Sequence, residues 1–174
     1  MESEWQNQNL DDLITKRNQG VNTTTEKVTY SESGTTVVRA NNITAGVIDY
    51  DKVTFVDTET YSRIKDACKP KQGDILYTNI GSSFGNAAVV TTNEEFTIAW
   101  NVLRLQPRNH ISSSFLAYLL NEPTNKARIK GLNSSSTMPF VSGKELGKVD
   151  FNIPPSPSRN ALPTSLAHSM TRSS

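Results

Sequence analysis

The stretch GDILYTNIGSSFGNAAVVT, residues 73–91, indicates the fold class most clearly. Two apolar runs in it, residues 74–78 and 87–91, are rich in aliphatic and β-branched side chains and predict two strands. Between the runs, Gly81 and Gly85 permit positive φ angles, which favours a hairpin loop at residues 81–86. We therefore expect a β-rich domain that contains this hairpin.

Outward from the hairpin, the sequence predicts a mixed α/β (α+β) fold that is rich in strands and has a few short helices. β-Branched and apolar content predicts further strands at residues 35–40, 47–50 and 52–55, two within residues 95–105, and a last one at residues 149–153. Helices are expected at residues 58–68, at 115–120 after a serine cap, and from Pro123 to a stop at Gly131. Residues 5–16 fit a short helix or an edge element, and residues 138–146 fit a short helix or a turn.

Composition limits the class of protein. The 174 residues are 35% hydrophobic, enough for the core of one domain. No run reaches about 18 apolar residues and the first residues are not those of a secretory signal, so we expect neither a membrane span nor export. The single cysteine, Cys68, fits a reducing cytoplasm, which is the expected location. A net charge of +1 excludes a strongly basic protein that coats nucleic acid.

The composition changes near Pro155. Residues 1–155 hold 16 basic and 17 acidic side chains, whereas residues 156–174 hold two arginines, six serines and no acid. The second segment has neither helical nor strand periodicity. We expect one domain at residues 1–155 and a tail at residues 156–174.

Residues 81–85, GSSFG, match the G-x-S-x-G pattern of a hydrolase nucleophile elbow. That elbow needs a strand, a sharp turn and a helix, whereas a strand is predicted after this loop. His110 and His168 are the only histidines that could act as base, and His168 lies in the tail. A serine hydrolase using Ser83 is therefore a less favoured alternative.

Other catalytic patterns are absent from the sequence. The loop lacks the Lys-Ser/Thr of a P-loop, and one cysteine with two distant histidines forms no metal-ligand pattern. We expect no catalytic residue, no metal and no cofactor in this chain.

Polar side chains gather instead at predicted strand ends. Arg pairs with guanine edges, Asn with adenine edges, and Ser and Thr with either, in the major groove of DNA. Three cations on one predicted helix could contact phosphates, and the first and last of them share a face. The alternative is that all these residues are solvated loop and helix positions. The candidate DNA-binding residues are Arg39, Asn41, Asn42, Thr78, Asn79, Ser82, Ser83, Asn86, Lys126, Arg128 and Lys130.

The order of segments along the chain carries a resemblance. A tryptophan near the start is followed by VVRANNI (37–43), GVI (46–48), GDILYT (73–78) with its glycine loop, FLAYLL (115–120), GLNSSS (131–136), and FNIPP (151–155). This series resembles one target recognition domain of a type I restriction-modification specificity subunit, over residues 3–155. Each motif alone is weak, and the ordered set is specific, above all GDIL followed by IPP.

The resemblance implies a mixed α/β domain that recognises one half of a split DNA target without catalysis of its own. A complete subunit of this family has two such domains, separated by long conserved helices that fix the half-site spacing and dock the modification (methyltransferase) subunits. Methyl transfer and DNA cleavage, with S-adenosylmethionine, ATP and magnesium, then belong to partners: the modification subunit and, through it, the restriction subunit. A β-rich protein- or carbohydrate-binding module is the main alternative.

On this interpretation, Arg39→Ala or Asn79→Ala is expected to relax base preference. Lys130→Ala is expected to weaken binding to all sequences similarly.

The tail departs from the family, which continues after IPP with Pro-x-x-Glu-Gln and a spacer helix. When permitted codons for residues 158–174 are read one base earlier, they encode Leu-Pro-Glu-Arg-Ile-Ala-His-Ile-Leu-Gly-Thr-Leu-Asp-Asp-Lys-Ile-Glu. This sequence has the expected motif and helical apolar spacing. We therefore expect that a frame change near codons 155–157 removed the spacer helix. A monomer that binds the modification subunit weakly or not at all would follow.

Overall fold

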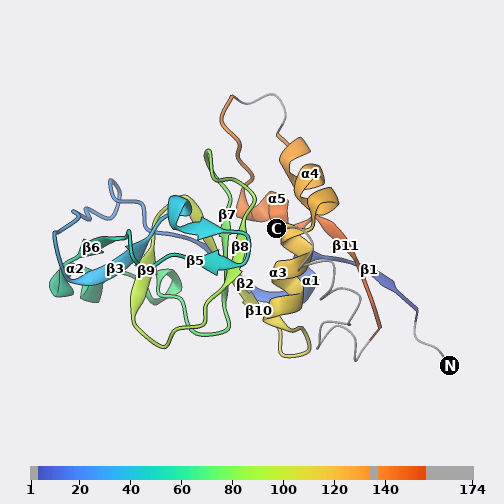
Figure 1. The fold of residues 1–174 in the computed structure, drawn as a ribbon, viewed down its shortest axis with the longest axis horizontal. Coiled ribbons are helices and arrows are strands. Elements are labelled where there is room, and N and C mark those ends of the chain that lie inside the picture. Colours follow the sequence, from blue (N-terminus) through green and yellow to red (C-terminus); the bar gives the residue numbers. More distant parts are fainter. Residues whose placement is uncertain (1–3, 134–136, 156–174) are drawn as a thin grey trace.

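A computed structural model describes residues 4–133 and 137–155, and it has the strand-rich, mixed α/β class predicted from the sequence (Figure 1). The strands are β1 (Gln6–Asn9), β2 (Ile14–Gln19), β3 (Thr35–Val38), β4 (Ile43–Thr44), β5 (Val47–Ile48), β6 (Thr54–Val56), β7 (Ile75–Thr78), β8 (Ala87–Val89), β9 (Phe96–Ile98), β10 (Val102–Pro107) and β11 (Asp150–Ile153). The α-helices are α1 (Leu10–Leu13), α2 (Thr58–Arg63), α3 (Ser113–Asn121), α4 (Pro123–Gly131) and α5 (Gly143–Gly147). Two 3-10 turns are η1 (Ala40–Asn42) and η2 (Asp66–Cys68).

The predicted hairpin forms half of a four-stranded antiparallel sheet with the order β2-β10-β7-β8. Tyr77 pairs with Ala87, and the loop between them has Gly81 and Gly85 at φ angles of 95° and 91°. The hairpin prediction is confirmed, including the positive φ angles of its glycines.

Strand β7 is buried on both faces, which explains its unbroken apolar sequence. Successive side chains of a strand point to opposite faces. Ile75 and Tyr77 accordingly belong to one hydrophobic cluster with α1, α3, α4 and α5, whereas Leu76 belongs to a second cluster with β3 and β9. A strand with two buried faces needs apolar residues at every position.

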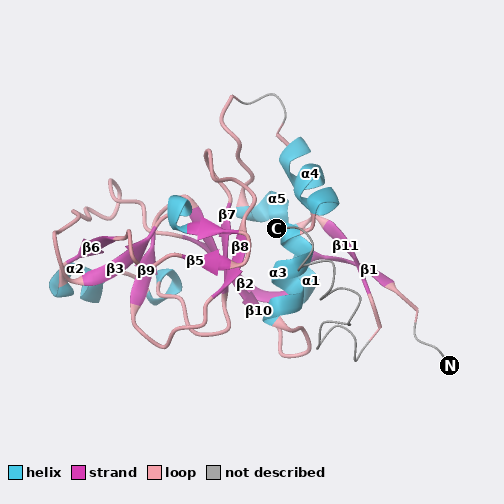
Figure 2. Cartoon of the chain, in the orientation of Figure 1, coloured by secondary structure: helices cyan, strands magenta, loops and turns pink. Residues whose placement is uncertain are grey.

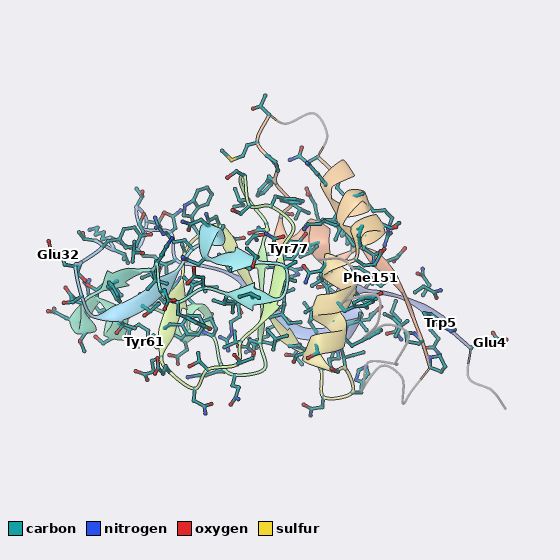
Figure 3. The ribbon with its side chains drawn as sticks, in the orientation of Figure 1. Glu4, Trp5, Glu32, Tyr61, Tyr77 and Phe151 are labelled. Atoms are coloured by element: carbon teal, nitrogen blue, oxygen red, sulfur yellow. The ribbon has the colours of Figure 1, made fainter. Side chains whose placement is uncertain are left out.

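A second sheet with the order β6-β3-β9 lies beside the first, and its β3–β9 pair is parallel. Two smaller units are the hairpin β4–β5 and the ribbon β1–β11, in which Gln8 pairs with Phe151. Helices α1, α3, α4 and α5 gather on the side of the β1–β11 ribbon, and α2 lies at the opposite end of the molecule from that ribbon (Figure 2). Tyr77 and Phe151 lie toward the side with these helices, and Tyr61 lies beside the β6-β3-β9 sheet (Figure 3).

One helix prediction, for residues 58–68, needs correction, whereas residues 5–16 hold both predicted alternatives, a short helix and an edge strand. They form β1, α1 and β2 because Asn9 caps a single turn, its side chain accepting a hydrogen bond from the Asp12 N–H at 3.1 Å. Residues 58–68 form α2 and η2, since α2 ends at Arg63. At the start of α2, hydrogen bonds from Thr60 to the Asp57 carboxylate lower the pKa of Asp57.

The predicted helices near residues 115 and 123 are confirmed. Ser112 caps α3, because its hydroxyl oxygen accepts a hydrogen bond from the Phe115 N–H, and Pro123 begins α4. In the part of the chain that the structure describes, no helix is long and apolar enough to span a membrane. The predicted tail at residues 156–174 lies outside the described residues.

Candidate functional site

Strand register brings three turns to one end of the two larger sheets. Val38 pairs with Ile98 in parallel, so β3 and β9 end together, and Val102 pairs with Thr78, so β10 begins where β7 ends. The turns that follow are the η1 turn (residues 39–42), the β7–β8 loop (residues 79–86) and the β9–β10 turn (residues 99–102). We call this surface the three-turn face.

Hydrogen bonds join the three turns directly. The Ala40 N–H donates to the Asn101 side-chain oxygen at 3.3 Å, which links the η1 turn to the β9–β10 turn. Asn86 Nδ2 donates to the Ile43 carbonyl oxygen at 3.1 Å, which links the β7–β8 loop to the end of the η1 turn. The turns are therefore held relative to one another without any ligand.

A pair of side-chain amides, of which Asn79 is buried, anchors the start of the β7–β8 loop. Asn79 and Gln19 donate to each other's side-chain oxygens at 2.9 and 3.0 Å, and Asn79 Nδ2 also donates to the Val141 carbonyl oxygen at 2.9 Å. Asn79 is fully buried. A buried, fully paired amide holds backbone in place, so Asn79 fixes the loop.

Thr78 and Asn42 are also buried and internally paired. The Thr78 hydroxyl donates to the Ser83 carbonyl oxygen at 2.6 Å, and Asn42 bonds backbone groups of Arg39 and Lys52 at 2.9 Å each. The expectation that Asn42, Thr78 and Asn79 offer polar atoms at the surface is therefore corrected: all three side chains hold the turns from inside.

The other predicted residues of these turns reach the surface. Asn41 and Ser82 are exposed, and Arg39, Ser83 and Asn86 are partly exposed. Arg39 Nε is buried and has no hydrogen-bond partner among the described residues. A guanidinium has donors only, so the exposed part of the Arg39 side chain can donate to an incoming oxygen or nitrogen acceptor.

The three predicted cations of α4 divide between two sides. Lys126 Nζ donates to Asn86 Oδ1 at 2.9 Å, so its ammonium group joins the three-turn face. Arg128 instead bonds the Asp150 carbonyl oxygen and lies over the Phe151 ring, 5.9 Å from its centroid. Lys130 is exposed one turn after Lys126.

Acidic groups border the face at the η1 turn. The Asp49 N–H donates to the Asn42 carbonyl oxygen at 2.7 Å, and the Asp49 side chain accepts from the Asp51 N–H at 2.8 Å. Next to them, Tyr50 packs edge-on against Phe96, and burial together with the nearby Glu94 raises the pKa of Tyr50. The face is therefore mixed in charge, with cations at Arg39 and Lys126 and carboxylates beside η1.

Sequence reasoning missed Gln19, Trp100 and Asn101. Trp100 is 46% exposed at the β9–β10 turn, and the carbonyl oxygen of the same residue accepts a hydrogen bond from Gln19. The polar Asn101 between two apolar runs was the available signal for a turn there.

The loop GSSFG does not form a nucleophile elbow. The loop joins β7 to β8, so a strand follows the serines where an elbow needs a helix. Within residues 4–133 and 137–155, no group of three or more His, Cys, Asp or Glu side chains could hold a metal ion.

The fold and the three-turn face define a small α/β domain whose paired turns present polar side chains at one end of its sheets. A family model described as "Type I restriction modification DNA specificity domain" matches residues 2–160. The chain belongs to this family. A search of curated proteins found no match.

Solved structures share the fold. The chain matches one in a study described as "Structural basis underlying complex assembly and conformational transition of the type I R-M system", with a TM-score of 0.68 and 14% identity over 98% of this chain and 39% of that one. It also matches the HsdS subunit from Thermoanaerobacter tengcongensis, with a TM-score of 0.64 and 16% identity over 97% of this chain and 38% of that one. A type I S subunit from M. genitalium gives a TM-score of 0.53 and 16% identity over 87% of this chain and 35% of that one. The chain thus spans less than two fifths of each of these three chains.

Proposed function

We propose that this chain recognises one half of a split double-stranded DNA target through the three-turn face, as the DNA-recognition component of a type I restriction-modification system. The observation that carries this proposal is the match of residues 2–160 to a DNA specificity domain. The same match favours DNA over a protein- or carbohydrate-binding role.

The chemistry of the three-turn face supports contact with base edges. Arg39 offers a fork of donors, Asn41 offers a donor and an acceptor, and Asn101, whose oxygen is held by the Ala40 N–H, offers its amide donors. Such groups pair with guanine and adenine edges in the major groove. Lys126 and Lys130 supply positive charge beside the loop for phosphate contacts that set the register of the protein on DNA.

Catalysis is assigned to partners in this proposal. The modification subunit would transfer the methyl group, and the restriction subunit, bound through it, would cleave DNA. The chain would act in the cytoplasm as a recognition component only. The expected monomeric state and weak binding to the modification subunit depend on residues 156–174, which lie outside the described residues, and stay predictions.

A binding-site selection tests the proposal. The parent chain should enrich a short sequence from duplexes with ten randomised base pairs. Arg39→Ala and Asn41→Ala should each relax preference at one position, by about 1–3 kcal/mol per base contact. Lys130→Ala should weaken binding to all sequences alike. It should also reduce the slope of log binding constant against log salt concentration by about the amount that one phosphate contact contributes.

Two controls separate DNA contact from folding. Arg63→Ala removes the same charge as Arg39→Ala from α2, which follows β6 and lies at the start of β3, whereas Arg39 follows the end of β3, and it should leave both affinity and preference unchanged. Asn79→Ala should lower the free energy of unfolding by about 1–3 kcal/mol, because it leaves the buried Val141 carbonyl oxygen without its donor. A parent chain that enriches no sequence would contradict the proposal.

A further inference from the structure

Trp100 occupies an outward position in a closed turn. The Val102 N–H donates to the Ala99 carbonyl oxygen at 3.0 Å, which places Trp100 and Asn101 at the two central positions of a β-turn. Ala99 and Val102 are buried, whereas Trp100 is 46% exposed. The indole is therefore the apolar group that this turn presents to solvent.

Contacts on both sides hold the turn. The Gln19 side chain donates to the Trp100 carbonyl oxygen, and Asn101 accepts from the Ala40 N–H at 3.3 Å. Gly20 allows the close approach of β2, since a Cβ atom there would lie 2.0 Å from the Ala99 carbonyl oxygen. The backbone that carries the indole is thus fixed before any ligand binds, and a tryptophan has only two side-chain torsions to order.

The surroundings of Trp100 are mixed in charge, with Arg39 and Asn41 beside its turn and Asp49 and Asp51 at the border of η1. The Asn101–Ala40 hydrogen bond sets the indole's turn beside Arg39 and Asn41. Glu94 and Glu95 precede β9, five or more residues before Trp100, which corresponds to roughly 15 Å along an extended chain. An exposed aromatic group among fixed polar groups is typical of the centre of a binding surface.

We infer that Trp100 packs against the DNA duplex, covering deoxyribose rings and base edges in the groove while Arg39 and Asn41 make the polar contacts. The inference rests on the proposed function and goes beyond it, because it adds an apolar contact that excludes water from the polar ones. The major groove, about 12 Å wide, admits a narrow turn, and thymine methyl groups offer apolar partners there.

Two single-tryptophan variants test the inference, because the chain has only Trp5 and Trp100. Trp5 is 57% exposed at the start of the β1–β11 ribbon, away from the sheets (Figure 3), and serves as the matched control. In Trp5→Phe, the emission of Trp100 should change when duplexes enriched by the parent chain are added, and its quenching by acrylamide should fall at least about twofold. In Trp100→Phe, the emission of Trp5 should stay constant.

Affinity for the same duplexes gives the second readout. Trp100→Ala should weaken binding about five- to tenfold, and Trp100→Phe should retain most of the affinity, since an aromatic ring still covers the groove. Trp5→Ala should bind like the parent. Should Trp100→Ala fail to fold, Trp100→Phe and the fluorescence of Trp5→Phe still decide the matter.

The outcomes separate this inference from the function on which it rests. If the parent binds its enriched duplexes while Trp100 emission and quenching stay unchanged, the apolar contact is overturned and the proposed function stands. If the parent enriches no duplex, both are overturned.

Discussion

Arg104 on β10 and Asp74 at the start of β7 form a buried ion pair, with Arg104 Nε 2.7 Å from Asp74 Oδ2. Their side chains are 8% and 10% exposed. Arg104 also donates to the carbonyl oxygens of Asp66 and Ala67, at 3.0 and 3.2 Å, and Asp74 accepts from the Lys71 N–H at 2.7 Å. The pair therefore ties η2 to the central sheet and gives a physical reason for an acid directly before the apolar residues of β7.

Removing either charge of this pair should destabilise the protein strongly. Asp74→Ala or Arg104→Met leaves one buried charge without its partner and should lower the free energy of unfolding by about 3–5 kcal/mol. The double variant should lose less than the sum of the two single variants, because no lone charge stays buried. Urea unfolding measures all four proteins, and additive losses would show that the pair is not coupled.

The local part of the fold could be predicted from sequence, and the pairings between distant segments could not. The β7–β8 hairpin depends on neighbouring apolar runs and two glycines, which a short window contains. The parallel β3–β9 pair, by contrast, joins residues about 60 positions apart and left no periodic signal. The site divides in the same way.

Within the site, polar residue types marked the turns correctly, but burial decided their roles. Asn41 and Asn79 are equivalent in the sequence, each following a predicted strand. The structure exposes Asn41 and buries Asn79 against Gln19, 60 residues away. Trp100 was missed because it lies between two apolar runs, and its exposure follows from the β-turn that the Val102–Ala99 hydrogen bond closes.

Gly85 and Gly81 provide a matched pair for testing whether the Lys126 side chain packs against the β7–β8 loop at Gly85. Both have φ above 90°, so alanine introduces backbone strain of about 1–3 kcal/mol at either position. Only at Gly85 would the new Cβ meet Lys126, 3.0 Å from Cε, whereas nothing lies within 4 Å at Gly81. Gly85→Ala should therefore lower the free energy of unfolding more than Gly81→Ala.

The extra loss of stability in Gly85→Ala over Gly81→Ala should vanish in a Lys126→Ala background, because the new Cβ then meets no lysine side chain. Urea unfolding of six proteins measures this difference: the parent, Lys126→Ala, and each glycine variant in both backgrounds. An excess that persists without the lysine would place its cause in the backbone.

Tyr77 should make stability sensitive to alkaline pH. Its hydroxyl is buried and has no hydrogen-bond partner among the described residues, and burial raises the pKa of Tyr77 above its usual value. In the unfolded chain the phenol ionises near its ordinary pKa of about 10. Above that pH the unfolded state releases a proton that the folded state keeps, so the free energy of unfolding falls as pH rises.

At neutral pH, the free energy of unfolding of Tyr77→Phe should equal that of the parent or exceed it by up to about 1 kcal/mol, because the substitution removes an unpaired buried hydroxyl. Its stability should also fall less between pH 9 and pH 11 than that of the parent, about one unit either side of the ordinary tyrosine pKa. The exposed Tyr30 supplies the control, Tyr30→Phe, which should follow the parent. Parallel pH curves for Tyr77→Phe and the parent would contradict the buried, unpaired hydroxyl.

Residues 156–174 lie outside the described residues, and the nucleotide sequence of the gene tests whether a frame change produced them. The family match ends at residue 160, close to the change of composition after Pro155. In the shifted reading, two of the three bases of each codon come from the first two positions of an actual codon, which the amino acid largely fixes. A run of seventeen residues, 158–174, that yields both the Leu-Pro-Glu motif and helical apolar spacing is therefore poorly explained by chance.

We expect the gene to use, at residues 158–174, codons whose third bases encode the shifted sequence. Ser158 should be TCC and Leu162 should be TTG, for example, because the shifted proline and alanine codons require the bases CCG and GCC. Sequencing the gene measures this directly. Restoring the frame by one inserted base near codons 155–157 should then give a chain that forms a stable complex with a modification subunit, where the chain as it stands is expected to bind weakly or not at all. Third bases incompatible with the shifted helix would end this account while leaving the family assignment of residues 2–160 intact.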